Sequence, residues 1–206
     1  MLGWIASARA ALIPPATRTD SLLVDVACGG GLMTSYVKQL GYHHIGLDLT
    51  RSALVVAREH RLVPVQSDAA HLPLPDAIAD VVLLGEILEH VTDIGPVVEQ
   101  ACRILRPGGM LIVDSIADTR RARLVAVTVA ERIRGLAPTG IHDPALFVDR
   151  VQLAASCREF GVPLELTGIR LDLRSFVRWR TGRDVAARLV RSRSTAVMFQ
   201  GSGIKA

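Results

Sequence analysis

The sequence predicts an α/β fold in which helices cover both faces of a mostly parallel β-sheet. Up to about residue 115, short apolar runs alternate with segments of helical length, a pattern typical of parallel strands joined by crossover helices. These runs are apolar throughout, as expected for strands buried on both faces. The 206 residues, 50% of them hydrophobic, suffice for one sizeable core, so we expect a single domain over residues 1–206.

Each element can be located by its pattern. The strands expected in the first half span residues 21–27, 44–47, 62–65, 79–84 and 110–114, with helices near 31–40, 50–60 and 93–105. A helix is expected over 118–135, and another begins at Asp149, a capping residue, and ends at Gly161. Two last strands, 162–169 and 195–200, flank an arginine-rich insert. Right-handed crossovers bring the loops after the strand carboxyl ends to one edge, where such sheets bind ligands.

Composition excludes several classes of protein. No run approaches the roughly 20 apolar residues that span a bilayer, and the start of the chain lacks the features of a secretory signal. Three widely spaced cysteines, Cys28, Cys102 and Cys157, disfavour a disulfide framework or a zinc ribbon. We therefore expect a cytoplasmic protein. Residues 1–114 hold 8 Lys/Arg and 12 Asp/Glu, and residues 115–206 hold 16 and 8, so the second half can attract anionic partners.

A glycine loop follows the first expected strand. In the stretch from Asp25 to Gly31, Gly29, Gly30 and Gly31 stand where a strand ends and a helix begins. Glycine allows a tight turn and a close approach of a ligand to the backbone. A dinucleotide fingerprint requires another glycine where this chain has Thr34. The loop therefore favours a nucleotide-like ligand other than a nicotinamide cofactor.

Carboxylates follow the next two expected strands. Asp48, after the second strand, can accept hydrogen bonds from ribose hydroxyls. Asp68, after the third, can accept from an adenine amino group beside the backbone N–H of Ala69. With Asp25, these acids would repel phosphates, which indicates an adenosine ligand without phosphates. The alternative is that both aspartates only cap helices.

These motifs together resemble the S-adenosylmethionine (SAM) dependent methyltransferase superfamily. The resemblance rests on the stretches 24–31, 46–48, 67–68, 80–82 and 106–109. It implies a Rossmann-like three-layer sandwich whose seven-stranded, mostly parallel sheet has an antiparallel last strand. It also implies that Asp25, Gly29 and Gly31 hold the methionine part of SAM, Asp48 the ribose, and Asp68 with Ala69 the adenine. One departure is Ala27, where relatives commonly have glycine.

Two further stretches resemble the O-methyltransferases of ubiquinone biosynthesis. They are residues 86–91, Glu-Ile-Leu-Glu-His-Val, and residues 136–143, with Phe147 following. The resemblance implies methyl transfer from SAM to a phenolic or catechol oxygen of a lipid-tailed quinone precursor. That family usually has a longer N-terminal segment, so we expect a shorter cover over the substrate here.

An acidic cluster can activate such an acceptor. Glu86, Glu89 and His90 would share one face of a helical turn. That face could bind a divalent metal ion, Mg²⁺ or Zn²⁺, as the relatives' metal dependence also implies. Without a metal, Glu86 or His90 could remove the phenol proton. The glutamates could equally serve only the helix dipole. His142, in the second matching stretch, is a rival base or substrate contact.

The basic segments 118–135 and 170–193, the second with Phe176 and Trp179 among arginines, could rest on an anionic bilayer. This would place the protein at the inner face of the membrane. The alternative is an ordinary amphipathic helix with a solvated basic side.

Other open interpretations of the function are an enzyme for a soluble phenolic natural product and a SAM-binding scaffold without catalysis. Nucleic-acid methylation is disfavoured, because no separate RNA-binding module is present and Leu84 to Glu86 lacks the Pro-Pro-aromatic motif of DNA amino-methyltransferases.

Overall fold

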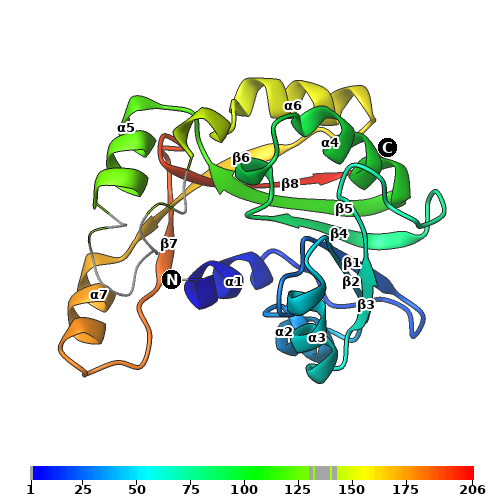
Figure 1. Cartoon of the computed structure of the whole chain (residues 1–206), viewed down its shortest axis with the longest axis horizontal. Helices are drawn as coiled ribbons and strands as arrows, with labels where there is room; N and C mark the ends of the chain where they lie inside the picture. Colours follow the sequence, from blue (N-terminus) through cyan, green and yellow to red (C-terminus); the bar gives the residue numbers. More distant parts are fainter. Residues whose placement is uncertain (1, 130–131, 133–139, 141–142) are drawn as a thin grey trace.

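The sheet expected from the sequence is present in the computed structural model, which describes residues 2–129, 132, 140 and 143–206. In the described residues eight strands form one sheet in the order β3-β2-β1-β4-β5-β8-β6-β7 (Figure 1). The strands are β1 (Leu22–Val26), β2 (His43–Asp48), β3 (Val63–Gln66), β4 (Ala79–Gly85), β5 (Leu105–Ile116), β6 (Glu165–Leu171), β7 (Leu189–Ser192) and β8 (Met198–Ile204).

The direction of the strands agrees with the predicted fold class. The strands from β1 to β5 pair in parallel, whereas β8 runs antiparallel to both β5 and β6. The strand count differs from the expected seven, because β7 adds an antiparallel edge strand beside β6. This strand lies inside the segment 170–193, whose arginine content masks the short apolar pair Leu189 and Val190.

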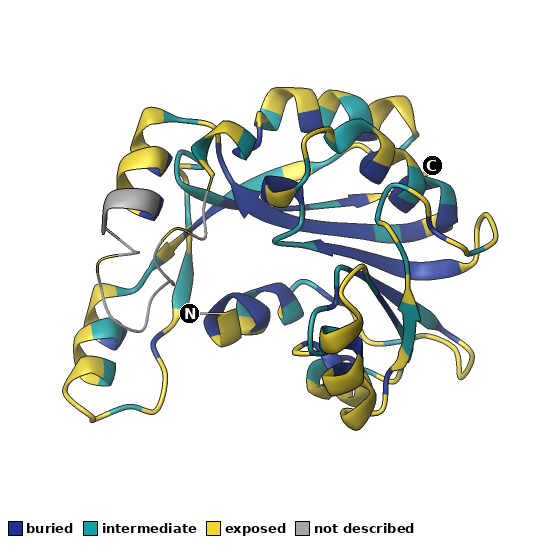
Figure 2. Cartoon of the chain, in the orientation of Figure 1, coloured by how far each residue is buried: buried dark blue, intermediate teal, exposed yellow. Residues whose placement is uncertain are grey.

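Helices cover both faces of the sheet. They are α1 (Leu2–Ala10), α2 (Thr34–Gln39), α3 (Arg51–Glu59), α4 (Ile94–Ile104), α5 (Arg120–Ala122), α6 (Arg150–Glu159) and α7 (Leu173–Arg180), with a π-helical turn at Arg123–Val129 and 3₁₀ turns at Leu88–His90 and Pro144–Leu146. Helices α4 and α6 pack on one face through a core that contains Val24 and Val98. Helices α1 and α2 pack on the other through Leu23 and Val37. Figure 2 shows this arrangement as buried strands between helices with exposed outer sides.

Local signals in the sequence predicted both ends of α6. Asp149 accepts hydrogen bonds from the backbone N–H groups of Val151 and Gln152, and Gly161 has a φ of +77° beyond the end of α6, as the sequence predicts. Of the helix expected over 118–135, the described part is helical from Arg120 to Val129. Helix α1, by contrast, has no counterpart among the sequence predictions.

No helix in the described part of the chain is long and apolar enough to cross a bilayer. The three cysteines are free and buried, and Cys102 of α4 and Cys157 of α6 are within hydrogen-bonding reach of each other. Cys102 and Cys157 contribute to the core between these two helices.

Candidate functional site

A pocket of about 390 Å³ lies at the carboxyl ends of four neighbouring strands. Its walls come from the loops after β1, β2, β3 and β4: Val26, Ala27, Leu47, Asp48, Leu49, Thr50, Ser67, Asp68, Ala69, Glu86, Ile87, His90 and Val91. Five residues singled out in the sequence, Asp48, Asp68, Ala69, Glu86 and His90, therefore line one pocket. Its volume lies within the range of roughly 300–1,000 Å³ typical of small-molecule sites.

The glycine loop needs its glycines for two reasons. Gly29 and Gly31 have φ angles of +52° and +79°, a left-handed region that favours glycine. A Cβ on Gly31 would also lie 3.2 Å from the Cα of Ala57 in α3. Ala27 adopts a φ of +60° without being glycine, so the departure from the family pattern strains the backbone as well as adding a methyl group.

Asp48 connects this loop to the second strand. Its Oδ2 accepts a hydrogen bond from Gly29 N–H at 2.9 Å, and its Oδ1 accepts from Thr50 N–H at 2.8 Å. The carboxylate is thus held in place by two backbone donors. Since its two oxygens offer about four acceptor positions, two remain for hydroxyl groups of a ligand. Asp48 does not cap α3, whose N-cap is Thr50, so its hydrogen bonds hold the loops together and leave acceptor positions for a ribose.

Asp68 has a similar but more open setting. Its Oδ1 accepts from Ala70 N–H at 2.9 Å, and its side chain is 59% exposed. None of the lining residues in the described chain is Lys or Arg. The wall thus carries carboxylates without the cations that a phosphate group needs, which fits an adenosine ligand such as SAM.

Asp25 does not line the pocket. Its side chain is buried on the face of the sheet that α1 and α2 cover, where its Oδ2 lies 3.7 Å from Nε2 of His44. Gly29 and Gly31 belong to the loop beside the pocket rather than to its lining. The structure therefore brings Asp48, Asp68 and Ala69 together in the pocket wall. Asp25 lies outside this wall, buried in strand β1 near His44.

The predicted face of Glu86, Glu89 and His90 does not form as one helical turn. Glu86 has a left-handed φ of +52°, and only Leu88–His90 forms a 3₁₀ turn. Glu86 and His90 line the pocket, whereas Glu89 is buried and accepts a hydrogen bond from Ser115 Oγ at 2.6 Å. This part of the prediction was wrong because the backbone bends at Glu86 in a left-handed conformation instead of continuing as a helix.

These three side chains do not converge on a common point. Among the described residues, no group of three His, Cys, Asp or Glu side chains is arranged to hold a metal ion. The implied metal therefore does not fit the described residues of the site in this conformation. His142 lies outside the described residues and stays a prediction.

Both glutamates are shifted toward the neutral form. Burial, with a further contribution from Asp114 and against a lowering by Arg9, raises the pKa of Glu86 to about 7. Burial also raises the pKa of Glu89 to about 8, against the hydrogen bond from Ser115. A carboxyl group with a pKa near neutrality can accept a proton at working pH and release it again.

Two charged residues of this region were missed by the sequence analysis. Arg9 of α1 donates from Nε and Nη2 to the two carboxylate oxygens of Asp114, at 2.5 and 2.7 Å. Burial lowers the pKa of Arg9, but Asp114 outweighs it, with Asp25 and Glu86 contributing, so the net pKa is raised. Asp114, like Asp48, is a polar residue near the carboxyl end of an expected strand, so the sequence could have indicated it as a site residue. No sequence signal marks Arg9.

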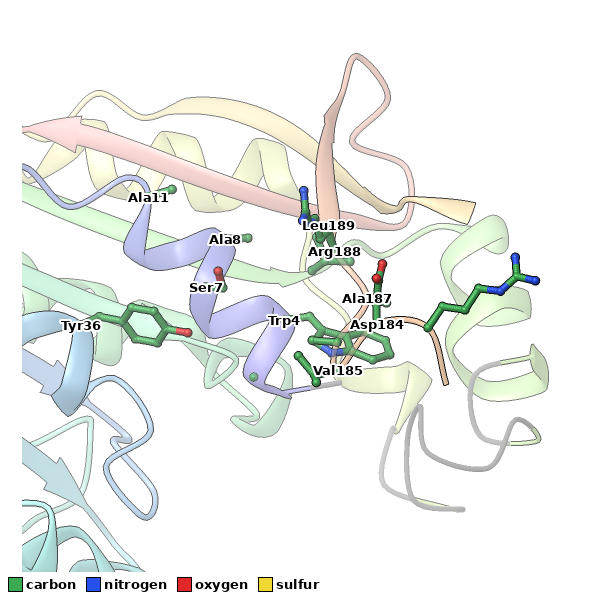
Figure 3. Close-up of a pocket in the computed structure, with 13 residues that line it drawn as sticks. Trp4, Ser7, Ala8, Ala11, Tyr36, Asp184, Val185, Ala187, Arg188 and Leu189 are labelled. Carbon is green, nitrogen blue, oxygen red and sulfur yellow. The ribbon is translucent and has the colours of Figure 1, made fainter. Parts of the chain in front are cut away.

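A second and larger cavity, of about 870 Å³, lies between α1 and the segment that leads into β7 (Figure 3). Trp4, Ser7 and Ala8 line it from α1, together with residues 183–189 before and in β7. Among the described residues, none that the sequence assigned to the cofactor, a metal or catalysis lines it. The smaller pocket is the candidate site, because there the polar groups of four strand ends converge.

Comparisons with known proteins agree with this geometry. A methyltransferase domain family matches residues 24–113. The ubiquinone biosynthesis O-methyltransferase of Thiobacillus denitrificans is 37% identical over 158 residues, which cover 71% of this chain and 67% of that protein. The enzyme of the same name from Xylella fastidiosa is 34% identical over 174 residues, 81% of this chain and 69% of that protein.

Solved structures support the fold. A SAM-dependent methyltransferase of Thermotoga maritima superimposes with a TM-score of 0.70 at 18% identity, covering 98% of this chain and 88% of that one. The YcgJ protein of Bacillus subtilis gives a TM-score of 0.68 at 14% identity, covering 100% and 99%. With the sequence relatives above, these comparisons show that the chain belongs to the SAM-dependent methyltransferases, in the family of the ubiquinone biosynthesis O-methyltransferases.

Proposed function

We propose that this chain transfers a methyl group from SAM to a phenolic or catechol oxygen of a lipid-tailed quinone precursor. The observation that carries the proposal is the position of Glu86, a carboxyl group with a pKa of about 7, in the same pocket as Asp48 and Asp68. One pocket thus combines acceptors for an adenosine with a group that can take a proton. The relatives named for ubiquinone biosynthesis support a quinone precursor as the acceptor.

The chain's residues bind and orient the methyl donor. Asp48, fixed by Gly29 and Thr50, accepts from the ribose hydroxyls, and Asp68 with the N–H of Ala69 binds the adenine edge. When bound, SAM supplies a methyl carbon activated by a positively charged sulfur. Held in this way, SAM would offer that carbon for in-line transfer to the acceptor oxygen, and the electron pair of the broken carbon–sulfur bond would stay on the sulfur. Such a displacement gains mainly from positioning.

Glu86 removes the acceptor proton. A phenol with a pKa of about 10, like that of tyrosine, is mostly protonated at neutral pH, so the proton must leave as the oxygen–carbon bond forms. The Glu86 carboxylate accepts it. His90 lines the same pocket and is the second candidate base.

The protein meets the bilayer through its basic end. Figure 1 shows α5 and α7 at the same end of the molecule. Leu173 and Val177 of α7 are 67% and 58% exposed, and Leu124, after α5, is 59% exposed, with arginines beside them. Trp179 does not contribute, because its ring packs edge-on against Trp4 at 5.0 Å. Exposed apolar side chains flanked by arginines suit an anionic membrane surface at the inner face of the membrane.

Incubation with methyl-labelled SAM and a panel of catechols, from soluble to polyprenylated, tests the proposal. Label in a lipid-tailed catechol, enhanced by anionic vesicles, is the expected result. Label only in soluble phenols would instead assign the enzyme to natural-product methylation. Binding of S-adenosylhomocysteine with no label in any acceptor would favour a non-catalytic scaffold.

An EDTA arm of the same experiment tests the metal. Label that persists with EDTA agrees with Glu86 or His90 as the base. Label that disappears with EDTA would mean that Glu86, Glu89 and His90 rearrange to hold a divalent ion.

A further inference from the structure

Helix α1 has two faces of different kinds. One face lines the 870 Å³ cavity of Figure 3, with Trp4, Ser7, Ala8 and Ala11. Its inner face buries Ile5, Ala6 and Arg9. The inner face packs α1 against the sheet, and Trp4 also packs edge-on against Trp179 of α7 at 5.0 Å.

Arg9 is the charged member of that inner face. Its Nε and Nη2 donate to Oδ2 and Oδ1 of Asp114, at 2.5 and 2.7 Å, and the two side chains are 9% and 1% exposed. The pair joins residues 105 positions apart in the sequence. The guanidinium lies directly on Gly85, where any Cβ would overlap it. A glycine is therefore required at position 85, because the Arg9 guanidinium occupies the space that a Cβ would need.

The same residues control the backbone at Glu86. Gly85 is the register partner of Asp114, and the carbonyl oxygen of Asp114 accepts the N–H of Glu86 at 3.1 Å. Glu86 is held at a left-handed φ of +52°, a conformation that persists only where its surroundings fix it. Arg9 thus binds the carboxylate of Asp114, and the backbone carbonyl of the same residue binds Glu86.

We propose that Arg9 is a positioning residue of the methyl transfer. Through Asp114 and Gly85 it holds the left-handed turn that presents Glu86 to the pocket, so that α1 is part of the active site although it lines no part of the cofactor pocket. This inference rests on the proposed function for its kinetic effect, but not for its structural effect.

Two variants perturb this contact by different routes. Arg9→Lys keeps the positive charge but cannot form the two-pronged bond to a carboxylate. Gly85→Ala changes no charge and displaces the guanidinium, while the φ of Gly85 is outside the left-handed region. We expect both to lower kcat by about 100-fold, the size of effect that a misplacement of 1 Å produces. The affinity for S-adenosylhomocysteine should change little, because Asp48 and Asp68 lie on other loops.

Arg106→Lys is the matched control. Arg106 of β5 donates from Nε to Asp80 of β4 at 2.7 Å, near the start of the two strands whose far ends carry Asp114 and Gly85. A purely structural role predicts similar losses of thermal stability and of kcat for the two lysine variants. The positioning role predicts a loss of kcat in Arg9→Lys and Gly85→Ala only, measured at a temperature where all variants are folded.

Hydrogen exchange of the Glu86 amide provides a readout without turnover. Faster exchange of this amide in Arg9→Lys and Gly85→Ala, but not in Arg106→Lys, supports the proposal even if no acceptor is methylated, in which case only the proposed function fails. Unchanged exchange, or a kcat no lower than that of the control in an active enzyme, overturns the proposal.

Discussion

The two halves of the pocket are built from different kinds of interaction. On the adenosine side, Asp48 and Asp68 are partly or largely exposed and are held by backbone N–H groups. On the acceptor side, Glu86 is half-buried in the pocket wall, Glu89 is fully buried outside the lining, and the charge of Asp114, the partner of Arg9, acts on both. The adenosine side is arranged to accept hydrogen bonds from the ligand, and the acceptor side is arranged to accept and release a proton. A single pocket can thus bind a cofactor by local motifs and activate an acceptor by burial.

This difference predicts that turnover and binding separate in variants. Glu86→Gln keeps the size of the side chain and removes its basicity, so we expect kcat to fall by about 10²–10⁴-fold, the usual contribution of a general base. Binding of S-adenosylhomocysteine should remain, as isothermal titration can measure. Glu89→Gln is the control, because Glu89 faces Ser115 instead of the pocket. Equal losses in both variants would remove the base assignment.

A change on the adenosine side should have the opposite signature. Asp48→Ala removes hydrogen bonds to a charged group, worth about 1.5–3 kcal/mol each, and we expect S-adenosylhomocysteine to bind at least ~10-fold more weakly. At saturating SAM, kcat should recover toward the wild-type value. An unchanged dissociation constant would show that Asp48 only supports the glycine loop.

The pH dependence of stability tests the burial of the acceptor side. Glu89 has a pKa of about 8 in the folded protein and about 4.3 unfolded. The folded state therefore favours the protonated form, and this stability is present below about pH 4 and is lost as the pH rises to about 8. We expect the unfolding temperature to fall over this range, and to fall less in Glu89→Gln. An identical pH profile for the two proteins would contradict the buried setting of Glu89.

The smallest effect concerns the loop of the adenosine side. Ala27 has a φ of +60°, which costs a residue with a Cβ roughly 1–2 kcal/mol. Ala27→Gly removes this strain but makes the unfolded chain more flexible, so we expect a gain in unfolding free energy of up to about 1 kcal/mol. Denaturant unfolding measures it. A loss of stability would mean that the methyl group of Ala27 contributes packing that outweighs the strain.

Features of the fold and the site that depend on neighbouring residues could be predicted from the sequence, and features that depend on tertiary contacts could not. The strands from β1 to β5, the glycine loop and the aspartates at strand ends depend on neighbouring residues, and the sequence predicted them. Two features depend on tertiary contacts instead: the turn at Glu86 and the pairing of Arg9 with Asp114, 105 residues away. A helical spacing of Glu86, Glu89 and His90 was misleading, because a backbone bond from Glu86 to Asp114 replaces the expected helix. Edge strand β7 was hidden for a similar reason, since pairing with β6 outweighs its weak local pattern.

The most direct test follows the transferred methyl group itself. The wild-type chain and Glu86→Gln would be given SAM with a ¹³C-labelled methyl group and a prenylated catechol, and the product examined by NMR. We predict an oxygen-bound ¹³C-methyl signal with the wild type and almost none with Glu86→Gln, although both bind S-adenosylhomocysteine. A product methylated on carbon, or equal product from both proteins, would contradict oxygen methylation with Glu86 as the base.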